Sequence, residues 1–382
     1  MYATRPLSLY RRDPSILSTL TKGSSISDYI VITDEETEAE DTCCWGTCKD
    51  PTVGEFPFPQ NKIVNVVYTS GSGEHRRTQT DKVWFIPVLD QPLSSNRYYV
   101  ITASGKYKGQ TCTCSTEEDT TVCCFCNVIK DVKPRVFDHR DIYQQVEVLN
   151  KKDVVIPLNL RTGWRLSTSS SYDCQLDEAL GLSVSLRLRL PPDSDIVQIS
   201  SKVSTPVVVG EWYCPFVFIM EGIPKEQMNN SLFYKMTLEQ SWEEIYTCEN
   251  HNSAGNSVSV NVTLQKEAIR LFGDEAKKDG AQDAKGFIWY RHVNSNTERS
   301  ELGLSAAIVE KMKWVQQQGG YEIEGENRDV TVERVEKFLG GNEWRRFLFF
   351  VLVERFALRR MDGTIVLTWD YKHIHQTRSK WD

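Results

Sequence analysis

Short runs of β-branched and aromatic residues recur through the first third of the chain and predict β-strands. Such runs cover residues 28–33, 63–68, 83–88 and 98–102. Gly71, Gly73 and Pro92 separate them, and runs of this length bounded by turn residues are typical of an antiparallel meander. The first run leads into residues 34–41, where six of the eight residues are acidic, so a solvated loop is expected there.

A further hairpin is expected between Gln110 and Ile129, with its turn in the polar segment 115–121. The dipeptide Lys133-Pro134 follows and has the composition of a linker. The sequence therefore predicts a β-rich N-terminal domain with a cysteine cluster, residues 1–132, and an α+β C-terminal domain, residues 133–382.

The second part of the chain contains several strand patterns. Leucine and valine alternate with serine and arginine from Leu182 to Leu190, a period of two that predicts a strand with one buried face. Residues 207–219 are apolar at most positions and predict a strand inside the sheet, broken near Pro215 because proline cannot donate a ladder hydrogen bond. Strands are also expected at 142–148, 257–272 and 287–293, and polar loops at 167–171 and 274–285.

Two segments show helical periodicity. Thr237-Leu-Glu-Gln240 is a capping box, and Leu238, Trp242, Ile245 and Tyr246 then fall on one helical face. Leu304, Ile308, Met312 and Val315 recur at helical spacing, and Gly319 stands where a C-terminal cap residue is expected. The predicted class is α+β: predominantly antiparallel or mixed β-sheet with two or more packed amphipathic helices and a C-terminal β-hairpin.

The C-terminal hairpin is predicted in most detail. Asp362-Gly363 favours a two-residue type I′ turn, which places Arg355 opposite Asp370 as a cross-strand ion pair. The other face of the hairpin is largely apolar but carries Glu354 and His373. A carboxylate among aromatic side chains needs a partner, and the diagonal neighbour His373 and the opposite Tyr371 can supply one.

This cluster has two interpretations. Glu354, Tyr371 and His373 are candidate catalytic residues, because acid–base groups in apolar surroundings are typical of active sites. The alternative is a structural role, in which hydrogen bonds satisfy buried polar groups at the end of a sheet. Solvent access to the three side chains distinguishes the two interpretations.

Eight of the eleven cysteines gather in two short segments. A hairpin over residues 110–129 would place Cys112 and Cys114 across from Cys124 and Cys126, and four thiolates could then bind Zn²⁺. Residues two apart on a flat strand lie too far apart for one zinc ion unless the strand bulges. The alternatives are no cofactor, with reduced structural cysteines, or redox-active or lipid-modified thiols such as palmitoylated Cys43-Cys44.

Composition and charge narrow the function classes. The net charge is −7, and such an acidic balance argues against nucleic acid as a partner. No stretch approaches the ~20 apolar residues of a transmembrane helix, and the first residues lack the apolar core of a signal peptide, so a cytoplasmic protein is expected. P-loop, His-Glu-x-x-His and Gly-x-Ser-x-Gly motifs are also missing from the sequence.

Several longer motifs carry a family resemblance. These are Tyr2-Ala-Thr-Arg-Pro-Leu-Ser-Leu-Tyr-Arg-Arg-Asp-Pro14, Phe56-Pro-Phe-Pro-Gln-Asn61, Cys123-Cys-Phe-Cys126, Asp141-Ile-Tyr-Gln-Gln145, Val207-Val-Val-Gly-Glu-Trp-Tyr-Cys-Pro-Phe216, Phe233-Tyr-Lys-Met-Thr-Leu-Glu-Gln240, Met361-Asp-Gly363 and His373-Ile-His-Gln-Thr-Arg-Ser-Lys-Trp381. Together they resemble the plant domain-of-unknown-function 1262 family, some members of which are labelled as insecticidal crystal toxin domains. The resemblance implies a plant source and brings no established activity or catalytic residues.

The expected function is that of a non-enzymatic binding protein, whose partner is another protein or a small-molecule ligand. Charge is segregated, since residues 344–382 contain eight Lys and Arg against four Asp and Glu while residues 34–41 carry only acidic charges. One alternative is an enzyme built on Glu354, Tyr371 and His373. Another is a peripheral membrane protein that uses Cys43-Cys44 together with the basic C-terminal region.

Overall fold

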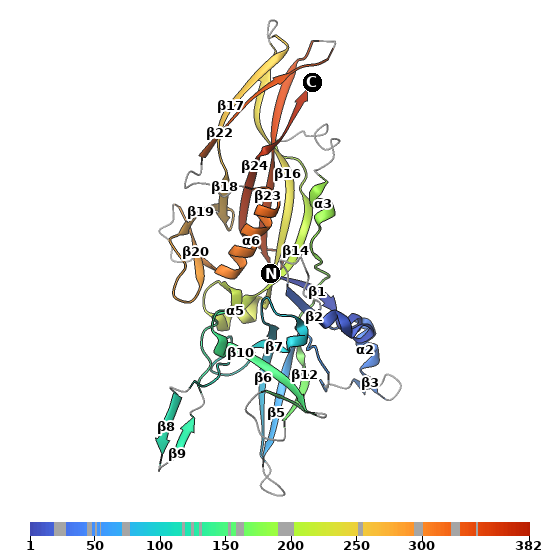
Figure 1. The fold of residues 1–382 in the computed structure, drawn as a ribbon, viewed down its shortest axis with the longest axis vertical. Coiled ribbons are helices and arrows are strands. Elements are labelled where there is room, and N and C mark those ends of the chain that lie inside the picture. The colour runs from blue at the N-terminus through green and yellow to red at the C-terminus, as the bar shows by residue number, and fades with distance from the viewer. Residues whose placement is uncertain are drawn as a thin grey trace.

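The computed structural model describes residues 1–18, 28–43, 48–49, 52–53, 55–70, 77–116, 119–123, 126–129, 132–151, 154–157, 164–189, 202–250, 255–293, 301–321, 329–340 and 343–382. Two large β-sheets dominate the fold and lie end to end along its long axis (Figure 1). The predominantly β, antiparallel and mixed character is therefore as predicted, while helices are few.

The larger sheet has twelve strands, ordered β15-β21-β20-β19-β18-β24-β23-β16-β14-β1-β2 with β13 paired to β14. In chain order these strands are β1 (Tyr2–Pro6), β2 (Asp28–Ile32), β13 (Gly181–Leu182), β14 (Val207–Pro215), β15 (Ile219–Met220), β16 (Phe233–Glu249), β18 (Glu267–Leu271), β19 (Asp274–Asp279), β20 (Phe287–His292), β21 (Glu301–Ser305), β23 (Arg346–Arg360) and β24 (Ile365–Trp381). Strands β1 and β2 are parallel, and the other ladders of this sheet are antiparallel.

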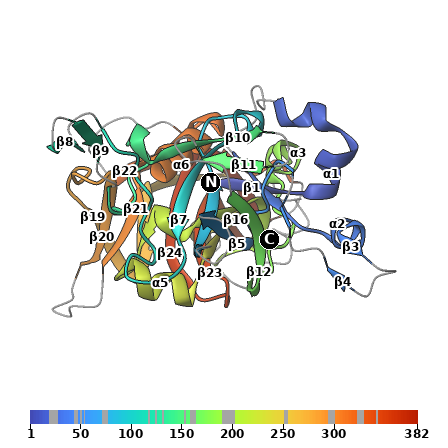
Figure 2. The same ribbon diagram turned by 90° about the horizontal axis from the view of Figure 1, so that it is seen from below.

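The smaller sheet has six strands in the order β11-β10-β7-β6-β5-β12. They are β5 (Lys62–Ser70), β6 (Arg77–Pro87), β7 (Arg97–Thr102), β10 (Gln145–Lys151), β11 (Val154–Pro157) and β12 (Trp164–Asp173). The meander β5-β6-β7 confirms the expected strand runs, whereas the polar loop expected at 167–171 is part of strand β12. Figure 2 views this sheet from its own end of the molecule, where β11 and β12 approach each other.

The remaining elements are two-stranded ladders, α-helices and 3₁₀ turns. The two-stranded ladders are β3 (Thr42–Cys43) with β4 (Cys48–Lys49), β8 (Thr120–Cys123) with β9 (Cys126–Ile129), and β17 (Ser257–Gln265) with β22 (Asp329–Lys337). The α-helices are α1 (Leu7–Arg12), α2 (Glu35–Glu40), α3 (Val184–Leu188), α5 (Pro224–Asn230) and α6 (Ala306–Gln318). The 3₁₀ turns are η1 (Pro14–Ser18), η3 (Leu93–Ser95), η5 (Ile142–Gln144) and η6 (Phe216–Phe218).

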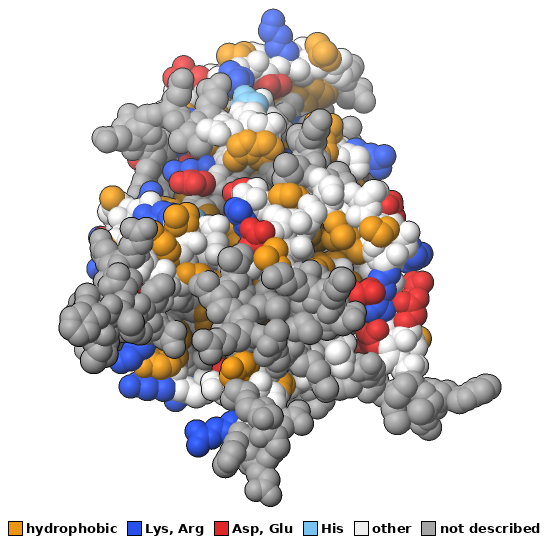
Figure 3. All heavy atoms as spheres, turned by 60° about the horizontal axis from the view of Figure 1, so that its bottom comes forward, with side chains coloured by type: hydrophobic (Ala, Val, Ile, Leu, Met, Phe, Trp, Pro, Cys, Tyr) orange, Lys and Arg blue, Asp and Glu red, His pale blue; other side chains and the backbone are white. Residues whose placement is uncertain are grey.

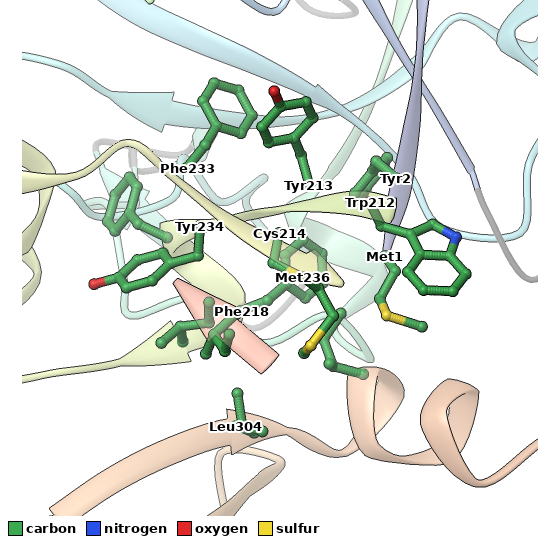
Figure 4. Close-up of a cluster of buried hydrophobic side chains, with 14 of the residues drawn as sticks. Met1, Tyr2, Trp212, Tyr213, Cys214, Phe218, Phe233, Tyr234, Met236 and Leu304 are labelled. Atoms are coloured by element: carbon green, nitrogen blue, oxygen red, sulfur yellow. The ribbon is translucent and has the colours of Figure 1, made fainter. Parts of the chain in front are cut away.

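One hydrophobic core joins the two sheets. Aromatic side chains from β6 and β7 pack against residues that follow β14, and Trp84 lies 5.8 Å from Phe216 and 5.0 Å from Phe233 between ring centroids. Figure 4 shows the adjacent part of this core, where side chains of β14 and β16 meet Met1, Tyr2 and Leu304.

The two sheets do not divide the chain at residue 133. Strands β1 and β2 from the start of the chain belong to the larger sheet, while β10, β11 and β12 belong to the smaller one. The division into folding units at residues 132 and 133 stays a prediction.

The helix expected after Thr237 is wrong, because residues 233–249 form strand β16. This strand pairs with β14 on one side and with β23 on the other, and these long-range hydrogen bonds override the local capping signal. The Thr237 hydroxyl donates to Glu239 Oε1 at 2.8 Å instead of capping a helix. Trp242 is nevertheless buried, as the pattern indicated.

The loop expected at residues 34–41 is also wrong, since Glu35–Glu40 forms helix α2. The side chain of Asp34 accepts a hydrogen bond from the Thr37 amide, which is an N-cap the acidic run concealed. Arg11 of α1 then pairs with Glu40 at 3.0 Å and with Asp41 at 2.9 Å. Acidic and basic side chains lie next to one another at the right of Figure 3, the side on which α1 and α2 lie in Figure 1.

Two other predictions are confirmed. Helix α6 spans Ala306–Gln318 and buries Ile308, Met312 and Val315 against the larger sheet, with Gly319 as its C-cap. The residue with positive φ is the following one, Gly320, at +80°. Strand β14 ends at Pro215, where a 3₁₀ turn begins, so the break falls where proline indicated it.

Candidate functional site

The C-terminal hairpin β23–β24 places the candidate site residues. Arg355 lies opposite Asp370, and Glu354 lies opposite Tyr371, in the predicted register. Arg355 binds Asp370 through two hydrogen bonds of 2.6 and 2.9 Å. The faces therefore separate as expected near the turn, with this ion pair on one face and Glu354 on the other.

The hairpin differs from the prediction at both ends. Its loop contains three residues, because Gly363 donates to the carbonyl of Arg360 and the Thr364 oxygen accepts from Arg360 N. Only Gly363 of the Asp-Gly pair has positive φ, at +88°, which is the geometry of a type I turn followed by a bulge. A register shift between Val351 and Leu352 then ends the predicted strand pairing in the part of the hairpin farthest from the turn.

Glu354 is bound by side chains from three other elements. Arg187 of α3 donates to both carboxylate oxygens, with Nε–Oε1 at 2.8 Å and Nη2–Oε2 at 2.7 Å. Gln240 of β16 donates to Oε1 at 2.9 Å, and His373 Nε2 lies 3.2 Å from Oε2. His373 Nε2 also lies 3.2 Å from Gln316 Oε1, and since both neighbours accept, Nε2 carries the proton.

The cluster is sealed between the larger sheet and helices α3 and α6. The exposed fraction of Glu354 is 1 %, and His373, Gln240 and Gln316 are equally inaccessible. The third nitrogen of the Arg187 guanidinium, Nη1, donates to the carbonyl of Val315 at 2.6 Å, near the end of α6.

Gly319 makes room for this guanidinium at the end of α6. A Cβ atom at residue 319 would overlap Arg187 Nη2. The buried ion pair therefore depends on a residue without a side chain at the C-cap.

The surroundings of Glu354 favour its ionised form. Burial alone would raise its pKa, but the hydrogen bond from His373 and the hydrogen bonds and charge of Arg187 outweigh burial and lower the pKa from 4.5 to about 2. A general acid near neutral pH needs the opposite shift. The carboxylate is thus held as a permanent anion that neutralises Arg187.

Tyr371 belongs to the same face but not to the hydrogen-bond network. Its ring stacks on Trp369 with centroids 5.4 Å apart and meets Tyr321 edge-on at 5.1 Å. Burial raises the pKa of its phenol well above 10, and its hydroxyl has no partner among the described residues. Of the three candidate catalytic residues, the structure brings Glu354 and His373 into contact and leaves Tyr371 beside them.

Arg187, the strongest partner of Glu354, comes from the segment whose strand prediction is wrong. Among the described residues of that segment, only Gly181–Leu182 forms a strand. Val184–Leu188 forms helix α3, whose N-cap Ser183 accepts from the Leu186 amide. A helix points Arg187 inward, and the Gln240 side chain also donates to the Arg187 carbonyl at 3.2 Å. The alternating arginines are the sequence signal for this residue, although a period of two with a buried leucine face predicts them on the solvent side.

Most apolar side chains around this helix face solvent instead, although Leu182 packs against the main core. The exposed fraction is 77 % for Leu180, 46 % for Val184, 41 % for Leu186 and 77 % for Leu188, while Arg187 is buried. Val184 and Leu188 lie one turn apart on the same side of the helix, and we call these two residues the α3 face. The usual arrangement of a surface helix, with leucines inward and arginine outward, is inverted here.

The cysteines occupy different places from those expected. Cys112 and Cys114 are reduced and lie before the β8–β9 ladder rather than on one of its strands. That ladder pairs Thr120–Cys123 with Cys126–Ile129 and sets Cys123 opposite Cys126, so the turn expected within 115–121 is wrong for these strands. Cys124 lies outside the described residues, and the zinc site at Cys112, Cys114, Cys124 and Cys126 stays a prediction.

Comparison with known proteins finds similarity to a protein family and to solved structures. Residues 23–125 match a family described as "Protein of unknown function (DUF1262)". A solved structure titled "Crystal structure of Cry35Ab1" is similar at a TM-score of 0.43 and 9 % identity, over 85 % of this chain and 90 % of that chain. At this score and identity, the likeness establishes neither a shared fold nor a shared function.

Two further findings concern relatives and membranes. No curated protein matches the chain. Among the described residues, the helices are all too short or too polar to span a membrane.

Proposed function

We propose that the protein is a non-enzymatic binding protein that recognises a partner protein through the α3 face. The observation that carries this proposal is the inverted helix, in which Arg187 is buried and Val184 and Leu188 are exposed. Such an arrangement lowers the stability of the isolated protein, because apolar side chains stay in water. A partner that covers these side chains recovers the lost hydrophobic stabilisation.

The loss of folding free energy has two contributions. Burying a leucine or valine side chain is worth about 1.5–3 kcal/mol, and this stabilisation is forgone for each side chain that stays in water. Moving Arg187 and Glu354 out of water costs several kcal/mol per ion, which their mutual attraction roughly offsets. Hydrophobic residues in place of Arg187 and Glu354 would hold the helix on the sheet with at least equal stability. The ion pair therefore sets the orientation of α3, with its apolar side outward.

The shape of the α3 face favours a protein partner over a small molecule. Small-molecule sites are concave and cover most of the ligand, whereas a helix on the outside of a sheet is convex. A groove on a partner can accept such a helix, with Val184 and Leu188 as anchors one turn apart. A partner with an aliphatic groove is therefore the expected class.

The geometry of the Glu354 cluster supports a structural role for these residues. Both carboxylate oxygens are already bonded to Arg187, and the exposed fraction of Glu354 is 1 %. A catalytic carboxylate must reach a substrate proton directly or through one water molecule. We therefore assign Glu354 and His373 to the anchoring of α3, and place the binding surface outside this cluster.

The proposal includes a cytoplasmic location and the plant source that the family resemblance implies. Support for a reducing compartment comes from Cys112, Cys114 and Cys214, which have thiols and no disulfide.

A matched pair of photocrosslinks tests the proposal. A photoreactive amino acid replaces Leu188 in the full chain, and in the control it replaces Leu339, whose exposed fraction is 94 %. The protein is expressed in its cell of origin, and the cross-linked partner is identified and purified. We expect this partner at residue 188 and not at residue 339.

The affinity of the purified partner provides the second readout. Leu188→Asp should weaken binding at least about tenfold, because a central apolar anchor contributes on the order of 2 kcal/mol, while Leu339→Asp should leave it unchanged. Identical cross-links at both positions, or equal affinities for both variants, would contradict the proposal.

A further inference from the structure

Two small ladders at the edges of the molecule share a cysteine pattern. Residues 43–48 read Cys-Cys-Trp-Gly-Thr-Cys and residues 123–126 read Cys-Cys-Phe-Cys, so each begins with two cysteines and an aromatic residue and ends with a third cysteine. Strand β3 places Cys43 directly opposite Cys48 of β4, and strand β8 places Cys123 directly opposite Cys126 of β9. In each case the first and last cysteines of the motif face one another across the ladder.

We propose that Cys43 with Cys48, and Cys123 with Cys126, form two reversible disulfides, which makes each ladder a thiol–disulfide modification site. Residues directly opposite in an antiparallel ladder have Cα atoms about 4.5–5.5 Å apart, within the roughly 4.4–6.8 Å span of a disulfide. The middle cysteine of each motif, Cys44 or Cys124, stands in the sequence between the two cysteines that the ladder pairs.

The position of the ladders suits a reaction with a small molecule. In Figure 1 the β8–β9 ladder stands away from the smaller sheet on one side, and Figure 2 shows β3–β4 beyond α2 on the opposite side. The two ladders are therefore independent sites. A low-molecular-weight disulfide such as oxidised glutathione is the chemical class we assign as oxidant.

The reaction balances in two exchange steps. The thiolate of one cysteine attacks a sulfur of glutathione disulfide, so that a protein–glutathione disulfide forms and one glutathione thiolate leaves. The thiolate of the opposite cysteine then attacks the protein sulfur, which forms the cross-strand disulfide and releases the second glutathione. The protein loses two electrons and two protons, and the small disulfide gains both.

Other cysteines of the chain provide internal references. Burial raises the pKa of the Cys112 thiol, and burial raises the pKa of Cys214 to about 11, so both are poor thiolates near neutral pH. Neither has a cysteine opposite it in a ladder of the described residues. We expect both to stay reduced in buffers that oxidise the two ladders.

The experiment uses the purified full chain in buffers of increasing glutathione disulfide to glutathione ratio. Acid quenching, differential isotope alkylation and peptide mass spectrometry then identify each linkage. We expect Cys43–Cys48 and Cys123–Cys126 disulfides that glutathione reverses, with Cys214 reduced throughout. Because Cys214 is buried, its protection also reports that the protein stays folded.

Serine variants separate this proposal from unspecific oxidation. Cys126→Ser should stop the reaction at the glutathione adduct of Cys123, whereas the matched Cys124→Ser should still form the Cys123–Cys126 disulfide. Cys48→Ser and Cys44→Ser form the equivalent pair in the other ladder. Linkages through Cys44 or Cys124, disulfides that glutathione does not reduce, or protection that disappears only after a zinc chelator is added would each overturn the proposal.

Discussion

Removing the charge of Glu354 is the sharpest test of how α3 is held in place. In Glu354→Gln the side chain keeps its size and one carbonyl oxygen, but the negative charge beside the buried Arg187 is lost. Arg187 then has only the Val315 carbonyl and a neutral amide as acceptors. Its positive charge is left without a counterion in the core.

The magnitude follows from the structure in two ways. Breaking one member of a buried ion pair destabilises a protein by about 3–5 kcal/mol, because an uncompensated charge stays buried. The lowering of the Glu354 pKa from 4.5 to about 2 corresponds to roughly 3 kcal/mol at 1.36 kcal/mol per pKa unit. We therefore expect the free energy of unfolding to fall by about 3 kcal/mol at neutral pH.

Acid pH gives an independent readout with a definite sign. Because the pKa of Glu354 is lower in the folded state, its contribution is complete above pH 4.5 and disappears as the pH falls towards about 2. The difference in stability between wild type and Glu354→Gln should therefore be largest near neutral pH and shrink across this window. Because both proteins contain the other carboxylates, subtracting their unfolding free energies at each pH cancels the contributions of those groups.

Urea denaturation of both proteins at several pH values measures this difference. The matched control is Glu301→Gln, since Glu301 pairs with Arg291 at the surface and should contribute less than about 1 kcal/mol at any pH. A loss for Glu354→Gln below about 0.5 kcal/mol, or one that does not change with pH, would refute the reasoning.

Three further substitutions test neighbouring parts of the fold. Gly319→Ala should destabilise by a few kcal/mol, because its Cβ overlaps the guanidinium of Arg187; Gly255→Ala, with open space around its Cβ, is the control, and equal denaturation midpoints would count against the packing. Trp242→Ala should cost about 3–5 kcal/mol as a fully buried aromatic of β16, and an unchanged midpoint would mean that this side chain is exposed. Gly363→Val should cost about 1–3 kcal/mol from its φ of +88°, and calorimetry showing no fall in Tm would contradict the turn assigned here.

The sequence predicted elements whose determinants are close together in the chain. The register of β23 with β24 follows from the turn residue Gly363 and the pair Arg355–Asp370, which lie within sixteen residues of each other. Helix α6 follows from its own apolar period. Contact between Glu354 and His373 was predictable for the same reason, because one hairpin carries both.

Local sequence patterns mispredict the elements that depend on distant partners. The segment after Thr237 carries a helical capping box, but Met236 and Leu238 also fit a period of two, and only pairing with β14 and β23 decides between the two patterns. Arg187 lies 167 residues from Glu354, so no local pattern linked them. An alternation of leucine and arginine identifies two faces but not which one is buried, and here the buried carboxylate reverses the usual choice.

The most direct test of the inverted helix is hydroxyl-radical footprinting of the leucine side chains. Leu339, which is 94 % exposed, and Leu304, which is fully buried, set the upper and lower limits of oxidation in the same sample. The account predicts that Leu188 oxidises at a rate near that of Leu339 in the purified protein and becomes protected when the partner binds. Protection of Leu188 at the level of Leu304 in the isolated chain would mean that this leucine is buried, and would contradict the α3 face as a binding surface.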